Sequence, residues 1–130
     1  MSYGYPAMAM DCLQPAIYIL ASGRRGTIYI GSTSNLMQRL HQHREGLIPG
    51  FTRRYGVRRL VHFEMFDTIG AAIVRERQLK EWRRAWKIEL IEQQNSHWDD
   101  LAVGLGFDPL PGREMDPGFR RDDNKMTGGM

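Results

Sequence analysis

Cysteine is almost absent from this chain of 130 residues, and the single Cys12 leaves no intrachain disulfide and no cysteine-based zinc site. Long apolar runs are also missing, because no stretch approaches the roughly 20 residues that a membrane helix requires. The first ten residues lack a basic segment followed by an apolar one, so they do not resemble a signal peptide. We therefore expect one cytoplasmic domain that does not associate with a membrane.

The net charge of +3 conceals an asymmetry along the chain. Residues 1–98 carry a net charge of +6, whereas residues 99–130 carry −3. In the basic part, arginine far outnumbers lysine and comes in adjacent pairs at 24–25, 53–54, 58–59 and 83–84. Guanidinium groups suit bidentate contact with phosphates, so this part predicts a nucleic-acid partner. An ordinary solvated surface is the alternative.

Composition divides the chain into three segments. Residues 1–14 form a flexible lead-in that contains glycine, proline and methionine. Residues 15–103 form the folded domain. Residues 104–130 form an acidic tail rich in glycine and proline, and we expect it to be disordered because it has too few branched apolar residues to bury.

Three short segments rich in β-branched and aromatic residues predict strands at 16–20, 27–31 and 60–65. A tight type II′ turn centred on Gly23 and Arg24 would place Tyr18 directly opposite Tyr29. A change of two in the sum of the paired residue numbers keeps both tyrosines on one face of the sheet, whereas a change of one separates them. In the third strand, simple alternation predicts that Val61, Phe63 and Met65 share a face.

Helical periodicity predicts helices over about 36–44 and 69–83, and a second helix or a bent continuation over 86–91. Several candidate N-cap residues precede the first helix, and Gly46 can end it. Together with the strands, these helices predict an α/β fold, a small three-stranded antiparallel sheet flanked by helices.

Glu76 lies within the apolar stripe of the helix predicted at 69–83. A carboxylate in that position is costly unless it is paired or bound to a metal ion. A salt bridge with Arg75, Lys80 or Arg83 is one interpretation, and a metal site is the other.

The ordered set Ile17-Tyr18, Tyr29-Ile30-Gly31, Arg39 and Glu76 resembles the GIY-YIG nuclease family. The resemblance covers about residues 15–95 and is greatest to the small single-domain bacterial members. Ala16 stands where the first motif of the family name has glycine, but the tyrosine of that motif is retained.

This resemblance implies a catalytic site. It implies that Tyr18 and Tyr29 lie at the catalytic centre, where one of them activates the attacking water. It also implies that Arg39 holds the scissile phosphate and that His43 contacts the catalytic tyrosine. Glu76 would bind one divalent cation, Mg²⁺ or Mn²⁺, and a single carboxylate is adequate because Mg²⁺ keeps waters and phosphate oxygens as its other ligands.

Further residues are candidates for nucleic-acid binding. Gly31 allows close approach of the backbone to a ligand, and Ser32 lies just before a helix N-terminus that favours phosphate. Arg53 and Arg54 belong to a basic and aromatic loop that could contact the DNA backbone. Asn95 is similar to a late asparagine of the family. Helix capping, a solvated loop and a helix-ending asparagine are the respective alternatives.

The sequence thus predicts a metal-dependent DNA endonuclease that hydrolyses phosphodiester bonds. We expect DNA as the substrate in preference to RNA, with selectivity for DNA structure and a link to repair or recombination beside a protein partner. A non-catalytic nucleic-acid-binding or docking module with the same fold is the alternative.

Overall fold

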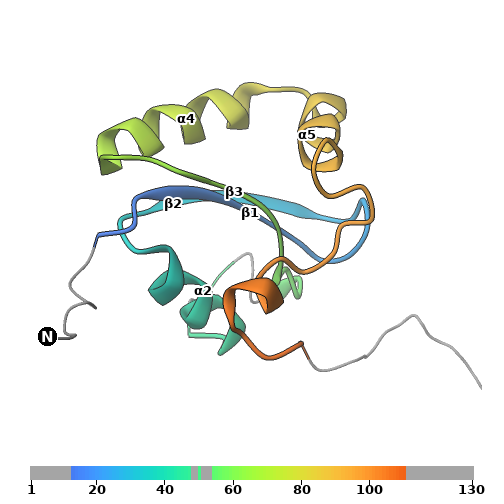
Figure 1. The fold of residues 1–130 in the computed structure, drawn as a ribbon. Helices are drawn as coiled ribbons and strands as arrows, with labels where there is room; N and C mark the ends of the chain where they lie inside the picture. The colour runs from blue at the N-terminus through green and yellow to red at the C-terminus, as the bar shows by residue number, and fades with distance from the viewer. Residues whose placement is uncertain (1–12, 48–49, 51–53, 111–130) are drawn as a thin grey trace, which may run out of the picture.

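The computed structural model describes residues 13–47, 50 and 54–110. The strands are β1 (Ala16–Ala21), β2 (Ile28–Thr33) and β3 (Arg59–Met65). The helices are α2 (Leu36–Arg44), α4 (Ile69–Glu81) and α5 (Arg84–Glu92), followed by a short 3₁₀ turn, η1 (Val103–Leu105). The sheet lies between α4 on one side and α2 on the other, with α5 at one end of α4 (Figure 1). The predicted α/β fold with an antiparallel three-stranded sheet is confirmed.

The sheet has the order β2–β1–β3, and both pairings are antiparallel. All six residues of the central strand β1 are buried because each face of the sheet carries a helix layer. Ile17 and Ile19 pack into a core that includes residues of α4 and α5. Tyr18 and Leu20 point the other way, into a core that includes residues of α2. We refer to these as the α4 side and the α2 side.

In the pairing of β1 with β2, the sum of the paired residue numbers is two higher than predicted. Tyr18 faces Gly31, and Tyr29 faces Leu20. The hairpin turn is wider than predicted, since Gly26 donates its amide to the Gly23 carbonyl at 3.0 Å and Arg25 adopts a φ of 54°. The two tyrosines nevertheless stay on the same face of the sheet, because a change of two in the sum preserves the alternation.

A bulge interrupts the pairing of β3 with β1 between Ile19 and Leu20. Because of the extra residue in β3, Val61 packs on the α4 side whereas Phe63 packs on the α2 side. The prediction that Val61, Phe63 and Met65 share one face was therefore wrong.

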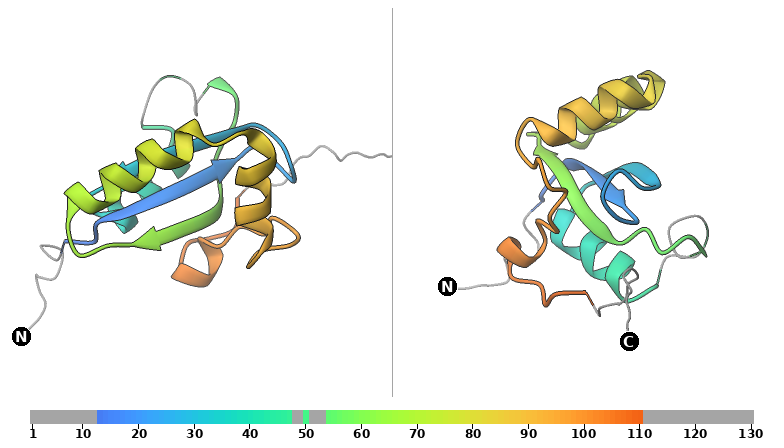
Figure 2. Two further views of the ribbon diagram at one scale, coloured as in Figure 1. Left: turned by 90° about the horizontal axis from the view of Figure 1, so that it is seen from above. Right: turned by 90° about the vertical axis from the view of Figure 1, so that its right-hand side faces the viewer.

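The predicted helical region from residue 69 onward is two helices. Thr68 caps the start of α4, since its hydroxyl accepts the Ala71 amide at 3.1 Å. The chain becomes extended at Trp82 and Arg83, and α5 then begins in a new direction, as Figure 2 shows. Trp82 and Trp86 pack edge to face across this junction, with ring centroids 6.1 Å apart. No helix in the described part is long and apolar enough to cross a membrane.

The C-terminal segment packs against both layers. Trp98 is fully buried on the α4 side, and Leu105 and Phe107 pack against the α2 side, although we expected residues from 104 onward to form a tail. At the other end, Gln14 of the predicted lead-in donates its amide to the Ser34 carbonyl at 2.7 Å. Packing thus extends beyond both expected boundaries of the domain, and residues 1–12 and 111–130 lie outside the described part.

Candidate active site

Three aromatic rings meet on the α2 side of the sheet. Tyr18 comes from β1, Tyr29 from β2 and His43 from the last turn of α2. The ring centroids of Tyr18 and Tyr29 are 6.3 Å apart, and the His43 ring lies 5.5 Å from that of Tyr18 and 5.8 Å from that of Tyr29. We call this group the ring cluster. The hairpin register and the short connection into α2 bring these three residues together.

Gly31 makes room for the ring cluster. A Cβ atom at this position would lie 2.6 Å from the Tyr18 hydroxyl oxygen and 3.1 Å from a ring carbon of Tyr29. The separation from the Tyr18 oxygen is shorter than any normal Cβ contact and that from Tyr29 is tight, so the absence of a side chain is a steric requirement here. The sequence predicted close approach to a ligand at Gly31, whereas the close approach in the structure is that of the Tyr18 ring.

A short hydrogen-bonded chain passes through the Tyr18 hydroxyl. Arg39 Nη1 donates to the Tyr18 oxygen at 3.3 Å, and His43 Nε2 lies 3.1 Å from the same oxygen. His43 is only 4% exposed, and this burial, with the nearby Arg39 charge, lowers its pKa to about 4. At neutral pH the imidazole is therefore uncharged, and its Nε2 can accept the Tyr18 proton.

Burial also governs Tyr18. It raises the pKa of the Tyr18 hydroxyl to about 12, and the Arg39 hydrogen bond lowers it less than burial raises it. Tyr29 and Glu76 add further electrostatic contributions that raise this pKa. Of these contributions, that of Glu76 is the smallest.

Glu76 projects from α4 toward the edge strand β2. Its Oε1 accepts the Ser32 hydroxyl, and its Oε2 lies 2.5 Å from Lys80 Nζ one turn later in the helix. The Glu76 side chain is 17% exposed and that of Lys80 is 52% exposed. Partial burial raises the pKa of Glu76, but hydrogen bonds from Lys80 and Ser32 outweigh this, so the pKa lies below its ordinary value. Glu76 is thus an ionised carboxylate.

The donor set suits a cation that takes few protein ligands. Among the described residues, no group of three or more histidine, cysteine or acidic side chains could surround a metal ion. The single carboxylate of Glu76, with the Ser32 hydroxyl beside it, fits Mg²⁺ or Mn²⁺, which takes one or two carboxylates and completes its shell with water and phosphate. A cation that binds Glu76 would have to displace the Lys80 ammonium or share the carboxylate with it.

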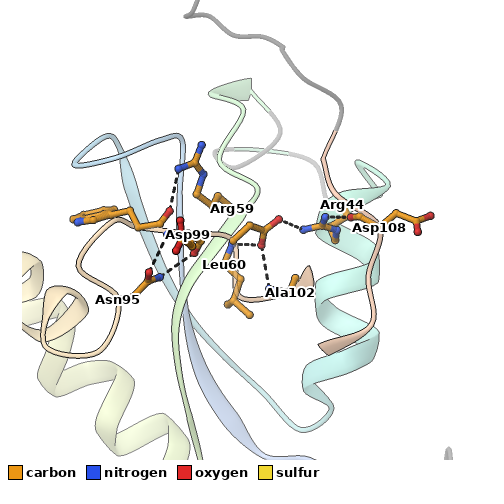
Figure 3. A network of polar contacts seen from close by, with 9 residues as sticks. Arg44, Arg59, Leu60, Asn95, Asp99, Ala102 and Asp108 are labelled. Atoms are coloured by element: carbon orange, nitrogen blue, oxygen red, sulfur yellow. Dashed lines mark hydrogen bonds and ion pairs between the residues drawn. The ribbon is translucent and has the colours of Figure 1, made fainter. Parts of the chain in front are cut away.

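The remaining candidates for nucleic-acid binding lie elsewhere. Arg54 is exposed and lies over the Tyr55 ring at 5.5 Å, while Arg53 lies outside the described residues. Asn95 is 6% exposed and belongs to the fold. Its Nδ2 donates to the Val61 carbonyl at 3.1 Å. Its Nδ2 also donates to the Asp99 carbonyl and its Oδ1 accepts the Asp99 amide, both at 2.9 Å (Figure 3). These bonds give Asn95 a role in the fold, and a contact with DNA stays a prediction.

A polar network on the α2 side was not foreseen from the sequence. Arg44, the residue after His43, pairs with Asp100 at 2.9 Å and also donates to the Asp108 carbonyl (Figure 3). The other carboxylate oxygen of Asp100 accepts the amides of Leu60 and Ala102 at 3.2 and 3.1 Å. We call this network the C-terminal clamp, because it ties the end of α2 to β3 and to the segment after residue 99. Nothing in the sequence around Asp100 indicates that it pairs with Arg44.

Comparisons with known proteins agree with the motif pattern. A family model described as the GIY-YIG catalytic domain matches residues 14–89. A UPF0213 protein of Syntrophus aciditrophicus is 37% identical over 78 residues, which cover 59% of this chain and 88% of that protein. A UPF0213 protein of Haloquadratum walsbyi is 37% identical over 67 residues, covering 52% and 75%. The solution structure of a UPF0213 protein from Bacillus halodurans aligns with a TM-score of 0.45 and 25% identity, over 74% of this chain and 100% of that one.

Proposed function

This chain belongs to the GIY-YIG catalytic domain family, and from that premise we propose that it is a metal-dependent DNA endonuclease. The observation that carries the proposal is the hydrogen-bonded chain from Arg39 through Tyr18 to His43, placed beside Tyr29 and within electrostatic reach of Glu76. A packed structural tyrosine needs one hydrogen-bond partner. The Tyr18 hydroxyl oxygen instead contacts both the Arg39 guanidinium and the uncharged His43 imidazole. This arrangement suits the transfer of a proton next to a negatively charged phosphate.

Each side chain then has a distinct task. Arg39 neutralises charge on the scissile phosphate, since guanidinium donors bind phosphate oxygens well. His43 is uncharged near pH 7, and its Nε2 accepts the proton of the Tyr18 hydroxyl as the Tyr18 oxygen takes a proton from the attacking water, while the Tyr29 hydroxyl beside it orients that water. Water attacks phosphorus in line with the leaving oxygen, and the products are a 5′-phosphate and a 3′-hydroxyl.

Glu76 and Ser32 would hold the divalent cation at the edge of β2. Such an ion stabilises charge on the phosphate and leaving oxygen and lowers the pKa of neighbouring hydroxyls. Burial holds the Tyr18 pKa at about 12, so Tyr18 keeps its proton at neutral pH.

The biological setting is also part of the proposal. We propose a cytoplasmic nuclease that selects DNA by structure and takes part in repair or recombination beside a protein partner. The alternative is a non-catalytic nucleic-acid-binding or docking module. Retention of all four motif residues, Tyr18, Tyr29, Arg39 and Glu76, favours the enzyme.

A substrate panel tests the proposal. The purified protein is incubated with Mg²⁺, Mn²⁺ or EDTA and with duplex, nicked, flap, branched and single-stranded DNA, and with matched RNA. We expect cutting of at least one DNA substrate that requires the cation and that is lost in Tyr29→Phe, which keeps the ring and removes only the hydroxyl. Binding without any cutting would support the non-catalytic alternative, and cutting that survives unchanged in Tyr29→Phe would mean that it does not depend on this tyrosine.

A further inference from the structure

A basic groove lies along the outer edge of β2, on the α4 side of the sheet. It has a volume of about 550 Å³ and lies between the edge strand and the junction of α4 with α5. Its lining includes three cationic side chains, Lys80, Arg84 and Lys87, together with apolar residues of β2 and the catalytic candidate Tyr29. No acidic side chain is among the described residues that line it. We call it the basic groove.

The cations are held by different elements and in different ways. Arg84 Nη2 donates to the carbonyls of Arg25 and Gly26 at 2.6 and 2.8 Å, which fixes its guanidinium beside the hairpin turn. Lys87 Nζ makes only a long contact of 3.5 Å, to the Lys80 carbonyl. Since a weak carbonyl contact satisfies little of an ammonium group, Lys87 can turn to an anion at low cost.

The helix geometry adds positive potential at the same place. Arg84 is the first residue of α5, a helix of nine residues whose N-terminus has no side-chain cap and no acidic residue in its first turn. The partial positive charge of that helix end is therefore not neutralised locally, and it adds to that of the three side chains. The groove is thus suited to an anion.

Lys80 links the basic groove to the proposed cation site. Its ammonium pairs with Glu76 at 2.5 Å, and the same residue lines the groove. An anion bound in the groove and a cation bound at Glu76 would each draw the two partners apart, so occupancy of one site favours occupancy of the other. A nucleic-acid strand supplies such anions at regular spacing on either side of a scissile phosphate.

We infer that the basic groove binds the phosphate backbone of the DNA strand next to the scissile bond, through Lys80, Arg84 and Lys87. This inference rests on the proposed function, because the scissile phosphate itself is assigned to Arg39. The contact is to the backbone and carries no base recognition, so it positions the strand without selecting a sequence.

Lys87→Ala is the informative variant, since Lys87 lines the groove but pairs with neither Glu76 nor the hairpin turn. Binding of a fluorescent duplex is measured by anisotropy in EDTA at several salt concentrations, which separates binding from cleavage. We expect affinity to fall roughly tenfold at low salt and the slope of log K against log salt to fall by about one unit. Lys87→Arg should restore most of the affinity.

Arg83→Ala is the matched control. Arg83 is an exposed cation one residue from Arg84, but it lies over the Trp86 ring at 4.6 Å and does not line the groove. Its loss should leave both affinity and salt slope nearly unchanged. Equal effects of Arg83→Ala and Lys87→Ala would overturn the groove and indicate a diffuse charge effect.

The two proposals fail in different ways. Normal binding by Lys87→Ala, with metal-dependent cleavage still abolished in Tyr29→Phe, would overturn the groove and leave the nuclease intact. Weakened binding by Lys87→Ala, in a protein that cuts no DNA, would leave the groove and overturn the enzyme.

Discussion

The two faces of the sheet hold the two halves of the candidate site in contrasting environments. On the α2 side, Tyr18 and His43 are almost fully buried, and burial dominates the pKa of each. On the α4 side, Glu76 shares its carboxylate with a half-exposed lysine and stays ionised. The proton-handling groups are thus shielded from solvent, whereas the metal-binding candidate lies beside a half-exposed lysine where ions and water can exchange. The interactions around Tyr18 and His43 are formed in the free protein, whereas the Glu76 carboxylate must exchange its lysine partner for a cation.

The largest effect is expected from Glu76→Gln on the α4 side. Loss of the carboxylate should reduce cleavage by roughly 10³-fold, because the cation would supply several kcal/mol of transition-state stabilisation. Stability should change by less than about 1 kcal/mol, since the lost ion pair with Lys80 is half exposed. Cleavage assays and thermal melting on the same sample measure both.

Glu81→Gln is the control, because it removes a charge from an exposed position at the end of the same helix. DNA binding in EDTA should be retained or slightly stronger in Glu76→Gln, since one anionic group near phosphate is gone. A mutant that melts much earlier yet still cuts DNA would return Glu76 to a purely structural salt bridge.

The next effect concerns the rigidity of the α2 side. Asp100→Ala should destabilise the fold by about 3–5 kcal/mol, because Arg44 would keep a buried charge and two backbone amides would lose their acceptor. Urea denaturation measures the loss, and Asp99→Ala, an exposed neighbour, should cost little.

Asp100→Asn separates the contribution of the ion pair with Arg44 from that of the hydrogen bonds to the backbone amides. Asparagine keeps an oxygen for the amides of Leu60 and Ala102 but loses the charge that pairs with Arg44. An intermediate stability is expected. If Asp100→Ala unfolds at the same urea concentration as the parent, the clamp does not hold α2, and the α2 side owes its rigidity to apolar packing alone.

A smaller effect is expected at Gly31. Gly31→Ala should cost about 1–3 kcal/mol, because its Cβ would overlap the Tyr18 hydroxyl and ring. Gly23→Ala is the control, since a Cβ there would meet no atom within 4 Å. The cost should shrink in a Tyr18→Leu background, where the overlapping atoms are absent, and a double-mutant cycle measures this coupling. Additive effects would contradict the steric account.

At neutral pH the smallest effect is that of His43, because its contribution to stability changes only in acid. Its folded pKa of about 4 lies below the ordinary value of about 6.5, so the unfolded chain binds the proton first as the pH falls. Stability from this group is complete above about pH 6.5 and is lost progressively toward pH 4, by at most about 1.4 kcal/mol per unit.

Denaturation curves of the parent and of His43→Gln between pH 4 and 8 isolate this contribution. The difference between the two should slope upward with pH only below about 6.5. A difference independent of pH would mean that His43 is as accessible to protons in the folded chain as in the unfolded one.

Much of this arrangement could be predicted from the sequence, and the failures have physical causes. The spacing of Tyr18, Tyr29, Arg39 and Glu76 identified the family because the motifs are local and short. The predicted direct pairing of the tyrosines was wrong because the turn uses four residues. Arg25 adopts a left-handed conformation in this turn, which an arginine does not indicate in a sequence. The face of Val61 failed because a bulge has no signature in alternating hydrophobicity.

The long-range ion pair between Arg44 and Asp100 could not be predicted from the sequence. Arg44 and Asp100 are 56 positions apart, and nothing in either neighbourhood selects the other. The family model also ends at residue 89, so Asp100 and the later residues of the clamp lie outside the matched region. The structural role of Asn95 could not be predicted for a related reason, since its partners are backbone groups that a motif cannot specify.

The basic groove has a consequence for how copies of this protein behave in concentrated solution. Both β2 and β3 are outer strands of the sheet, and outer strands expose backbone groups that can pair with another chain. The Leu60 carbonyl of β3 already accepts the Leu101 amide at 2.7 Å, so the segment around Leu101 covers part of the β3 edge of the sheet. Along β2, Lys80, Arg84 and Lys87 would bring like charges together if a second sheet approached. The cations that we assign to DNA thereby also oppose aggregation, and we expect that protection to weaken as salt screens them.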